Sequence, residues 1–218
     1  MARTKREALS RERILRVALD LVDREGLDAI SMRRVGEALG VEAMSLYNHV
    51  ANKAAILDGI FEAVLAEMPP AKRASSWKAS LRERGEALRA VLRAHPNALP
   101  LFATRPAVTI ASLAHLEAGL AVLRGAGFAP ADALRAFQVL LAFAVGHAIA
   151  SYSSIGADDL APPAYDELSE REFPYVREMA RALGDRDLEA EFHFGLEALL
   201  AGIELRSATK RSSRQRTP

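Results

Sequence analysis

The side chains best suited to binding a partner gather between Ser31 and Lys53 (SMRRVGEALGVEAMSLYNHVANK). Tyr47, Asn48 and His49 place a hydroxyl, an amide and an imidazole side by side, and Lys53 adds a cation four residues later. Such groups exchange hydrogen bonds with phosphate oxygens and with the edges of bases. The segment therefore predicts contact with DNA.

Two short helices joined by a tight turn would position these groups. Met32, Val35 and Leu39 recur at i, i+3 and i+7, which places them on one side of a helix. Gly40 follows at the position where a left-handed C-cap favours glycine. The same apolar face continues through Val41, Leu46 and Val50. This pattern predicts a helix-turn-helix whose second helix, residues 43–49, can enter the major groove of DNA.

Further helices are expected on both sides of this pair. Residues 10–25 carry an apolar stripe opposite charged residues and are followed by Gly26, which predicts an amphipathic helix. After the linker 27–30, Ser31 is a plausible N-cap. A fourth helix is expected over 53–68, and Pro69-Pro70 then marks a domain boundary.

The remainder of the chain also predicts helices alone, since no stretch alternates with period two for long enough to form a strand. They are expected over 77–95, 109–126, 130–155, 169–183 and 187–207, with an irregular piece at 97–105 and a loop at 156–168. Pro174 is expected in the first turn of its helix or at a kink. The fold class is all-α. An N-terminal three-helix DNA-binding domain with its coupling helix (1–68) precedes a C-terminal helical bundle for effector binding and dimerisation (69–207) and a basic disordered tail (208–218).

Two helices are more apolar than one modest domain needs. Residues 136–157 contain no charge, but Gln138, His147 and several serines interrupt the run that a bilayer-spanning helix requires. A soluble helix that is apolar all round is buried on all sides. Because the last helix is similar, we expect part of each to face an identical subunit in a homodimer. A core formed within one chain is the alternative.

Charge and composition limit the class of protein. The 218 residues have a net charge of +1, yet residues 1–16 hold six Lys/Arg against two Glu, and residues 206–218 hold five basic residues and no acid. Basic ends suit a polyanionic partner, with solvated tails as the alternative, which is favoured for the C-terminal end. Cysteine is absent, which excludes disulfides and thiol catalysis and fits a reducing cytoplasm. The N-terminus lacks the apolar stretch of a secretory signal.

Catalysis is not expected. The five histidines, His49, His95, His115, His147 and His193, form no HExxH motif and no repeated ExxH pair, and phosphate-binding glycine loops and GxSxG are missing. We therefore expect no enzyme, no cofactor and no metal site. A small α-helical enzyme is the remaining alternative from another class.

The stretch LGVEAMSLYNHVANKAAILDGI resembles the tetracycline-repressor (TetR) family of bacterial transcription regulators. The resemblance is strongest from Ile14 to Leu57 and continues more weakly through Trp77, Thr104-Arg105-Pro106 and the two long helices. It implies a cytoplasmic homodimeric repressor that binds a palindromic DNA operator and is released by a small molecule bound in the C-terminal domain. An activator, or a regulator without a small-molecule ligand, is the alternative.

The resemblance also implies which residues touch DNA. Ala43, Met44 and Asn48 stand where the repressor that gives the family its name has a glutamine, a proline and a tryptophan. A lost glutamine removes a base contact worth about 1–3 kcal/mol, so a different operator is expected. The full set of predicted DNA contacts is Arg33, Ala43, Met44, Ser45, Tyr47, Asn48, His49 and Lys53.

The effector implied by the resemblance is not magnesium–tetracycline. Leu101, Gly119, Arg84 and Ala150 stand where that repressor holds the drug and its metal with His, Gln, Asn and Glu. We therefore expect an apolar or anionic effector, with ordinary core packing as the alternative for every residue of the pocket. The candidate lining residues are Arg84, Leu88, Leu101, Phe102, Thr104, Arg105, Leu116, Leu120, Phe143 and His147.

Overall fold

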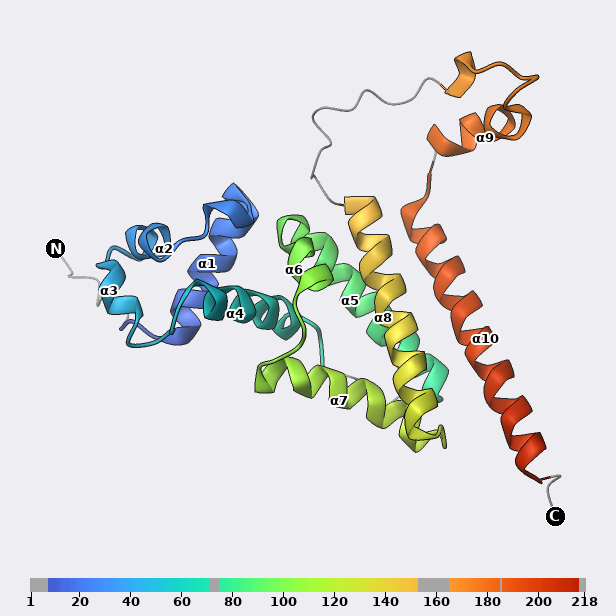
Figure 1. Ribbon diagram of the computed structural model, residues 1–218, viewed down its shortest axis with the longest axis horizontal. Coiled ribbons are helices and arrows are strands. Elements are labelled where there is room, and N and C mark those ends of the chain that lie inside the picture. Colours follow the sequence, from blue (N-terminus) through green and yellow to red (C-terminus); the bar gives the residue numbers. More distant parts are fainter. Residues whose placement is uncertain (1–7, 71–74, 153–164, 185, 216–218) are drawn as a thin grey trace. The chain divides into compact units, whose positions relative to one another are not determined.

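The computed structural model describes residues 8–70, 75–152, 165–184 and 186–215, and every regular element in these ranges is a helix (Figure 1). The chain divides into two compact units, residues 1–152 and residues 153–218. The first unit includes the boundary predicted at 68/69, because the fourth helix packs against helices that precede and follow that boundary. The all-α fold class predicted from the sequence is confirmed.

The N-terminal helices begin at capping residues, of which Ser31 was predicted from the sequence. Ser10, Ser31 and Asn52 each adopt an extended backbone and accept a hydrogen bond from an amide three residues on, as N-caps do. A short 3-10 turn, η1, occupies most of the predicted linker. The elements are α1 (Arg11–Glu25), η1 (Leu27–Ala29), α2 (Met32–Leu39), α3 (Ala43–Leu46) and α4 (Lys53–Ala66).

Helices α1 and α4 form the centre of this part. Ile14 and Leu21 from α1 and Ile56 and Ile60 from α4 are fully buried. Gly59 lets the helices approach closely, since a Cβ there would lie 2.2 Å from a methyl group of Leu15. Apolar burial of this kind is the main stabilising contribution to the helix pair.

The N-cap of α4 offers a direct test of how this helix is fixed. The side-chain oxygen of Asn52 accepts a 2.9 Å hydrogen bond from the amide of Ala55. We expect Asn52→Ala to destabilise the protein by about 1 kcal/mol, and Asn52→Asp, which keeps the acceptor, to cost less. For a unit of this size that loss lowers Tm by about 2–4 °C. Thermal unfolding monitored by circular dichroism measures this decrease in Tm. Equal Tm values for the wild type and the alanine variant would contradict the cap assignment.

Four helices and one 3-10 turn complete the first unit. Residues 97–105, expected to be irregular, are almost entirely helical: Pro96 and Pro100 each occupy the first turn of an element, where the missing proline N–H costs nothing. Helices α5, α7 and α8 pack against one another, and α6 contacts α8 (Figure 1). The elements are α5 (Trp77–Ala94), η2 (Pro96–Ala98), α6 (Leu99–Thr104), α7 (Ile110–Gly125) and α8 (Pro130–Tyr152).

The second unit contains η4 (Tyr165–Glu167), α9 (Pro174–Gly184) and α10 (Leu188–Gln215). Helix α9 begins at Pro174 rather than at Ser169, since proline is favoured at a first helical position. Helix α10 continues to Gln215, whereas the sequence predicted its end at Ser207 and a disordered tail beyond. Residues 153–164, including most of the predicted loop, lie outside the described ranges.

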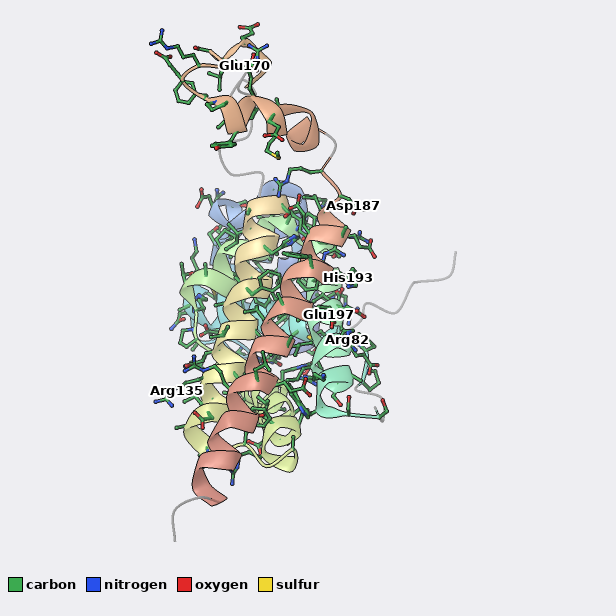
Figure 2. The ribbon with its side chains drawn as sticks, turned by 90° about the vertical axis from the view of Figure 1, so that its right-hand side faces the viewer. Arg82, Arg135, Glu170, Asp187, His193 and Glu197 are labelled. Carbon is green, nitrogen blue, oxygen red and sulfur yellow. The ribbon has the colours of Figure 1, made fainter. Side chains whose placement is uncertain are left out.

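Helix α8 is long and apolar enough to cross a membrane by length and composition, although one such helix is weak evidence of a span. Leu134, Val139 and Leu141 on this helix are exposed within the one chain, and the expectation that part of it faces an identical subunit stays a prediction. Its charged residues Asp132 and Arg135 pair at its first turns, and Figure 2 shows Arg135 projecting from the helix.

Candidate functional site

The turn between α2 and α3 has the geometry expected of a helix-turn-helix. Gly40 adopts a left-handed conformation (φ 67°, ψ 37°), and its amide and that of Val41 donate to carbonyls of the last turn of α2. A Cβ at Gly36 would lie 2.9 Å from the carbonyl oxygen of Val41, so the turn packs directly on α2. Val35, Leu39 and Leu46 are buried between the two helices, as their spacing predicted.

Helix α3 is shorter than predicted. It ends at Leu46 instead of His49, because the following amides bond three residues back: Tyr47 N–H donates to Met44 (3.3 Å) and His49 N–H to Leu46 (2.9 Å). Bonds of this type tighten the last turn of a helix. Residues 43–49 therefore form one helical turn and one tighter turn, which we call the recognition segment.

Both polar and apolar side chains of the recognition segment are exposed to solvent. Met44 is 74% exposed and Tyr47 48% exposed, while the neighbouring Leu46 is fully buried and holds the segment in place. Asn48 and His49 are exposed, and Ala43 and Ser45 are half-buried. Met44, Tyr47, Asn48 and His49 are therefore accessible to a partner, while Leu46 anchors the segment.

The two arginines at the start of α2 differ in what they can do. Arg34 donates through two guanidinium nitrogens to Glu25, which occupies its charge. Arg33 is 83% exposed and makes a 2.9 Å ion pair with Glu37 one turn later. Exposed pairs of this kind are weak, so Arg33 can exchange Glu37 for a phosphate group. Lys53, at the start of α4, is also exposed.

A cavity of about 220 Å³ lies where the end of α4 meets α5 and α7. Arg84 on α5 is half-buried at the cavity and donates to the main-chain carbonyl of His115 (2.9 Å). Burial lowers the pKa of Arg84, and no carboxylate pairs with it among the residues that the structure describes. The lining residues are Met68, Pro69, Pro70, Glu83, Arg84, Ala87, Ala114, His115 and Ala118.

The neutral form of His115 is favoured at the same cavity. Burial lowers the pKa of its ring, and the positive charge of Arg84 lowers it further. Glu83 also lines the cavity, but it forms no ion pair with Arg84 in the part of the chain that the structure describes, so the guanidinium lies unpaired beside largely apolar walls. A desolvated cation of this kind binds anions well.

Comparison with known proteins identifies the family. A profile described as "Bacterial regulatory proteins, tetR family" matches residues 14–60, and one described as "Tetracyclin repressor-like, C-terminal domain" matches residues 69–207. The chain belongs to the TetR family of transcriptional regulators. The resemblance found in the sequence is thereby confirmed.

Related proteins cover nearly the whole chain. An HTH-type transcriptional regulator of Saccharopolyspora erythraea is 32% identical over 89% of this chain and 84% of its own length. Tetracycline repressor protein class D of Escherichia coli is 31% identical over 90% of each chain. The TetR family protein ActR of Streptomyces coelicolor, solved in complex with (S)-DNPA, superposes with a TM-score of 0.78 at 29% identity, covering 90% of this chain and 98% of ActR.

The TetR resemblance implied ten effector-binding residues, of which Arg84 lines the cavity. Several of the others serve contacts of their own. Phe102 packs against Phe61 of α4 with ring centroids 4.5 Å apart, and Arg105 pairs with Asp58 of α4. The remaining nine residues do not line this cavity, and their role in effector binding stays a prediction: Leu88, Leu101, Phe102, Thr104, Arg105, Leu116, Leu120, Phe143 and His147.

Sequence reasoning missed several residues that the structure brings to the cavity. Pro69 and Pro70 were interpreted only as a domain boundary, yet they form part of the wall beside Arg84. Their position directly after the coupling helix was the available signal. His115 was examined only as a metal ligand, and nothing in its spacing indicated that its carbonyl would accept from Arg84.

Proposed function

We propose that this protein is a transcriptional repressor that binds a palindromic operator as a homodimer and is released by a small anionic molecule. Residues 1–68 would contact DNA, and residues 69–207 would bind the effector and the second subunit. The single observation that carries the proposal is the exposed recognition segment, in which buried Leu46 supports solvent-facing Met44 and Tyr47.

The chemistry of that segment supports a division of roles. His49 and Lys53 suit phosphate oxygens, Tyr47 can hydrogen-bond a phosphate or a base edge, and Arg33 is free to exchange its ion pair. Met44 suits contact with a thymine methyl group, and Asn48 can form paired hydrogen bonds with adenine. Ala43 and Ser45, which are half-buried, would approach the groove with their small side chains.

Dimerisation is supported by apolar side chains left in solvent on both long helices. Leu134, Val139 and Leu141 of α8 and Phe194 and Leu205 of α10 are exposed, with Phe194 at 80%. Figure 2 shows the polar side chains of His193 and Glu197 along α10, so the apolar side chains occupy only part of its surface. A second copy of the chain would cover them in an isologous interface.

The effector class follows from Arg84. A half-buried guanidinium without a carboxylate partner favours a carboxylate, phenolate or sulfonate, and the apolar lining favours a ring system. The ActR structure with (S)-DNPA supports a small-molecule response within the family. For the effector to release the protein from DNA, it need only bind more tightly to the conformation that cannot bind DNA.

Selection of bound DNA from a random pool by the purified protein tests the proposal. The expected product is a palindrome whose half-sites lie about one helical turn, roughly 34–36 Å, or a multiple of it apart. Sedimentation of the complex should show two chains per duplex. Recovery of sequences without enrichment over non-specific binding would refute it.

A charge variant beside the recognition segment tests the role of Arg33. Glu37→Gln removes the carboxylate that pairs with Arg33 at 2.9 Å and leaves Arg33 free for phosphate. We expect a several-fold higher affinity for the selected DNA at low salt, with the advantage shrinking as salt increases. Fluorescence anisotropy titrations at several salt concentrations measure it. Glu117→Gln on α7, an equal change of charge elsewhere, should leave the affinity unchanged; a decrease with Glu37→Gln would contradict the role of Arg33.

A further inference from the structure

His95 links three segments of the first unit through both nitrogens of its ring. It follows the last residue of α5, and its side chain is only 11% exposed. Nδ1 lies 2.9 and 3.0 Å from the two carboxylate oxygens of Asp23 on α1, and Nε2 lies 3.0 Å from a carboxylate oxygen of Glu67 at the end of α4. We call this arrangement the His95 bridge.

The geometry of the bridge requires a proton on each nitrogen. A neutral imidazole carries one N–H and one lone pair, so a neutral ring would turn a lone pair toward a carboxylate. The imidazolium donates from both nitrogens and satisfies both carboxylates. Hydrogen bonds between charged partners are about twice as strong as those between neutral groups.

The bridge joins the DNA-binding helices to the wall of the cavity. Asp23 lies in the last turns of α1, and Asn97 of η2 also donates to its main-chain carbonyl (3.0 Å). Glu67 directly precedes Met68, Pro69 and Pro70, three of the residues that line the cavity beside Arg84. A displacement of this wall would therefore move Glu67, and the hydrogen bonds of His95 would transmit that movement to Asp23 on α1.

We propose that His95 is a positioning residue that ties α1 to the cavity wall through Asp23 and Glu67, and that this tie opens when the ring loses its proton. This inference rests on the proposed function, because the cavity wall that His95 holds is part of the proposed effector site. It adds to that function a loss of the tie as pH rises.

The electrostatic surroundings give the direction of the pH effect. Burial lowers the pKa of the His95 ring, but the hydrogen bonds and charges of Glu67 and Asp23 outweigh it and raise the pKa above its ordinary value. Across the described parts of α1, α4, α5, α6 and α8, the charged groups that act on the ring are these two carboxylates. Because the folded-state pKa is raised above the unfolded value of about 6.5, the stabilisation is complete below pH 6.5 and is lost as pH rises through the folded-state pKa.

Hydrogen exchange on the full chain tests the bridge without DNA or effector. The reporters are the amides of Gly26 and Met68, which donate to Val22 and Leu65 at the ends of α1 and α4. After correction for intrinsic exchange, we expect their protection to fall about tenfold from pH 6 to pH 9 in the wild type. The amide of Gly127, bonded to Arg124, should not change.

Two variants distinguish a pH-dependent tie at His95 from a histidine that has only a structural role. His95→Asn should give the low protection of Gly26 and Met68 at both pH values, whereas His193→Asn on α10 should keep the wild-type profile. Absence of a pH effect in the wild type, or its persistence in His95→Asn, would overturn the proposal.

Glu67→Gln provides a second test that does not alter the ring. NMR titration should show a lower pKa for His95 in this variant, together with lost protection of Met68 at pH 6. An unchanged His95 pKa would overturn the bridge even if His95→Asn failed to fold. Because neither measurement involves DNA, the bridge and the proposed repressor function can fail independently.

Discussion

Tyr47→Ala is expected to abolish sequence-specific DNA binding while leaving the fold and the dimer intact. The side chain is 48% exposed and lies just after the last residue of α3, beside the buried Leu46 that anchors the segment. Its removal from a dimer deletes one contact in each of two half-sites. At about 1.5–3 kcal/mol for a hydrogen bond to a charged group, the loss over two half-sites is about 3–6 kcal/mol, or roughly 150-fold and more in affinity.

The measurement compares binding with folding in the same preparation. Fluorescence anisotropy with the selected operator gives the affinity, and analytical ultracentrifugation and thermal unfolding give the dimer and its Tm. An exposed side chain removed from a surface normally changes stability by less than about 0.5 kcal/mol. Tyr175→Ala, which truncates an exposed tyrosine of α9 outside the proposed DNA contacts, is the matched control. Specific affinity that survives in Tyr47→Ala would show that the recognition segment does not contact DNA as proposed.

The fold could be predicted from the sequence because its signals are local. Ser10, Ser31, Asn52 and Gly40 fix helix ends by hydrogen bonds and backbone conformation within one turn, and the sequence analysis identified the caps at Ser31 and Gly40. The apolar face of the helix-turn-helix was equally visible, since Val35, Leu39 and Leu46 follow helical spacing. Errors arose where prolines that begin helices were interpreted as breaks, as in residues 96–105.

The site was only partly visible for a physical reason. Side chains that point outward from a helix, such as Met44 and Tyr47, can be assigned from periodicity alone. A cavity depends on which helices meet and at what distance, and this information is not local. The pairing of Arg84 with a main-chain carbonyl 31 residues away, and of His95 with Asp23 72 residues away, therefore could not be predicted from the chain.

Arg84→Met is expected to remove the preference of the cavity for anions while preserving its shape. Methionine keeps much of the length of the apolar stem but carries no charge and no N–H donors. A hydrogen bond to a charged group contributes about 1.5–3 kcal/mol, which corresponds to roughly 10-fold to 150-fold in affinity. The loss should fall on anionic ligands alone, since the walls formed by Ala87, Ala114 and Ala118 are unchanged.

A pair of probes of similar shape separates charge from apolar burial at this cavity. Its volume of about 220 Å³ is below the roughly 300–1,000 Å³ of pockets for drug-sized ligands, so small aromatic molecules are suitable. We expect 1-naphthoate to bind the wild type more tightly than 1-naphthamide, and Arg84→Met to weaken only the naphthoate, as measured by titration calorimetry. Equal weakening of both probes would instead indicate that Arg84 shapes the cavity. In that case the charge of the effector would have to be recognised by another residue, and the guanidinium would serve to hold α5 to the carbonyl of His115 on α7.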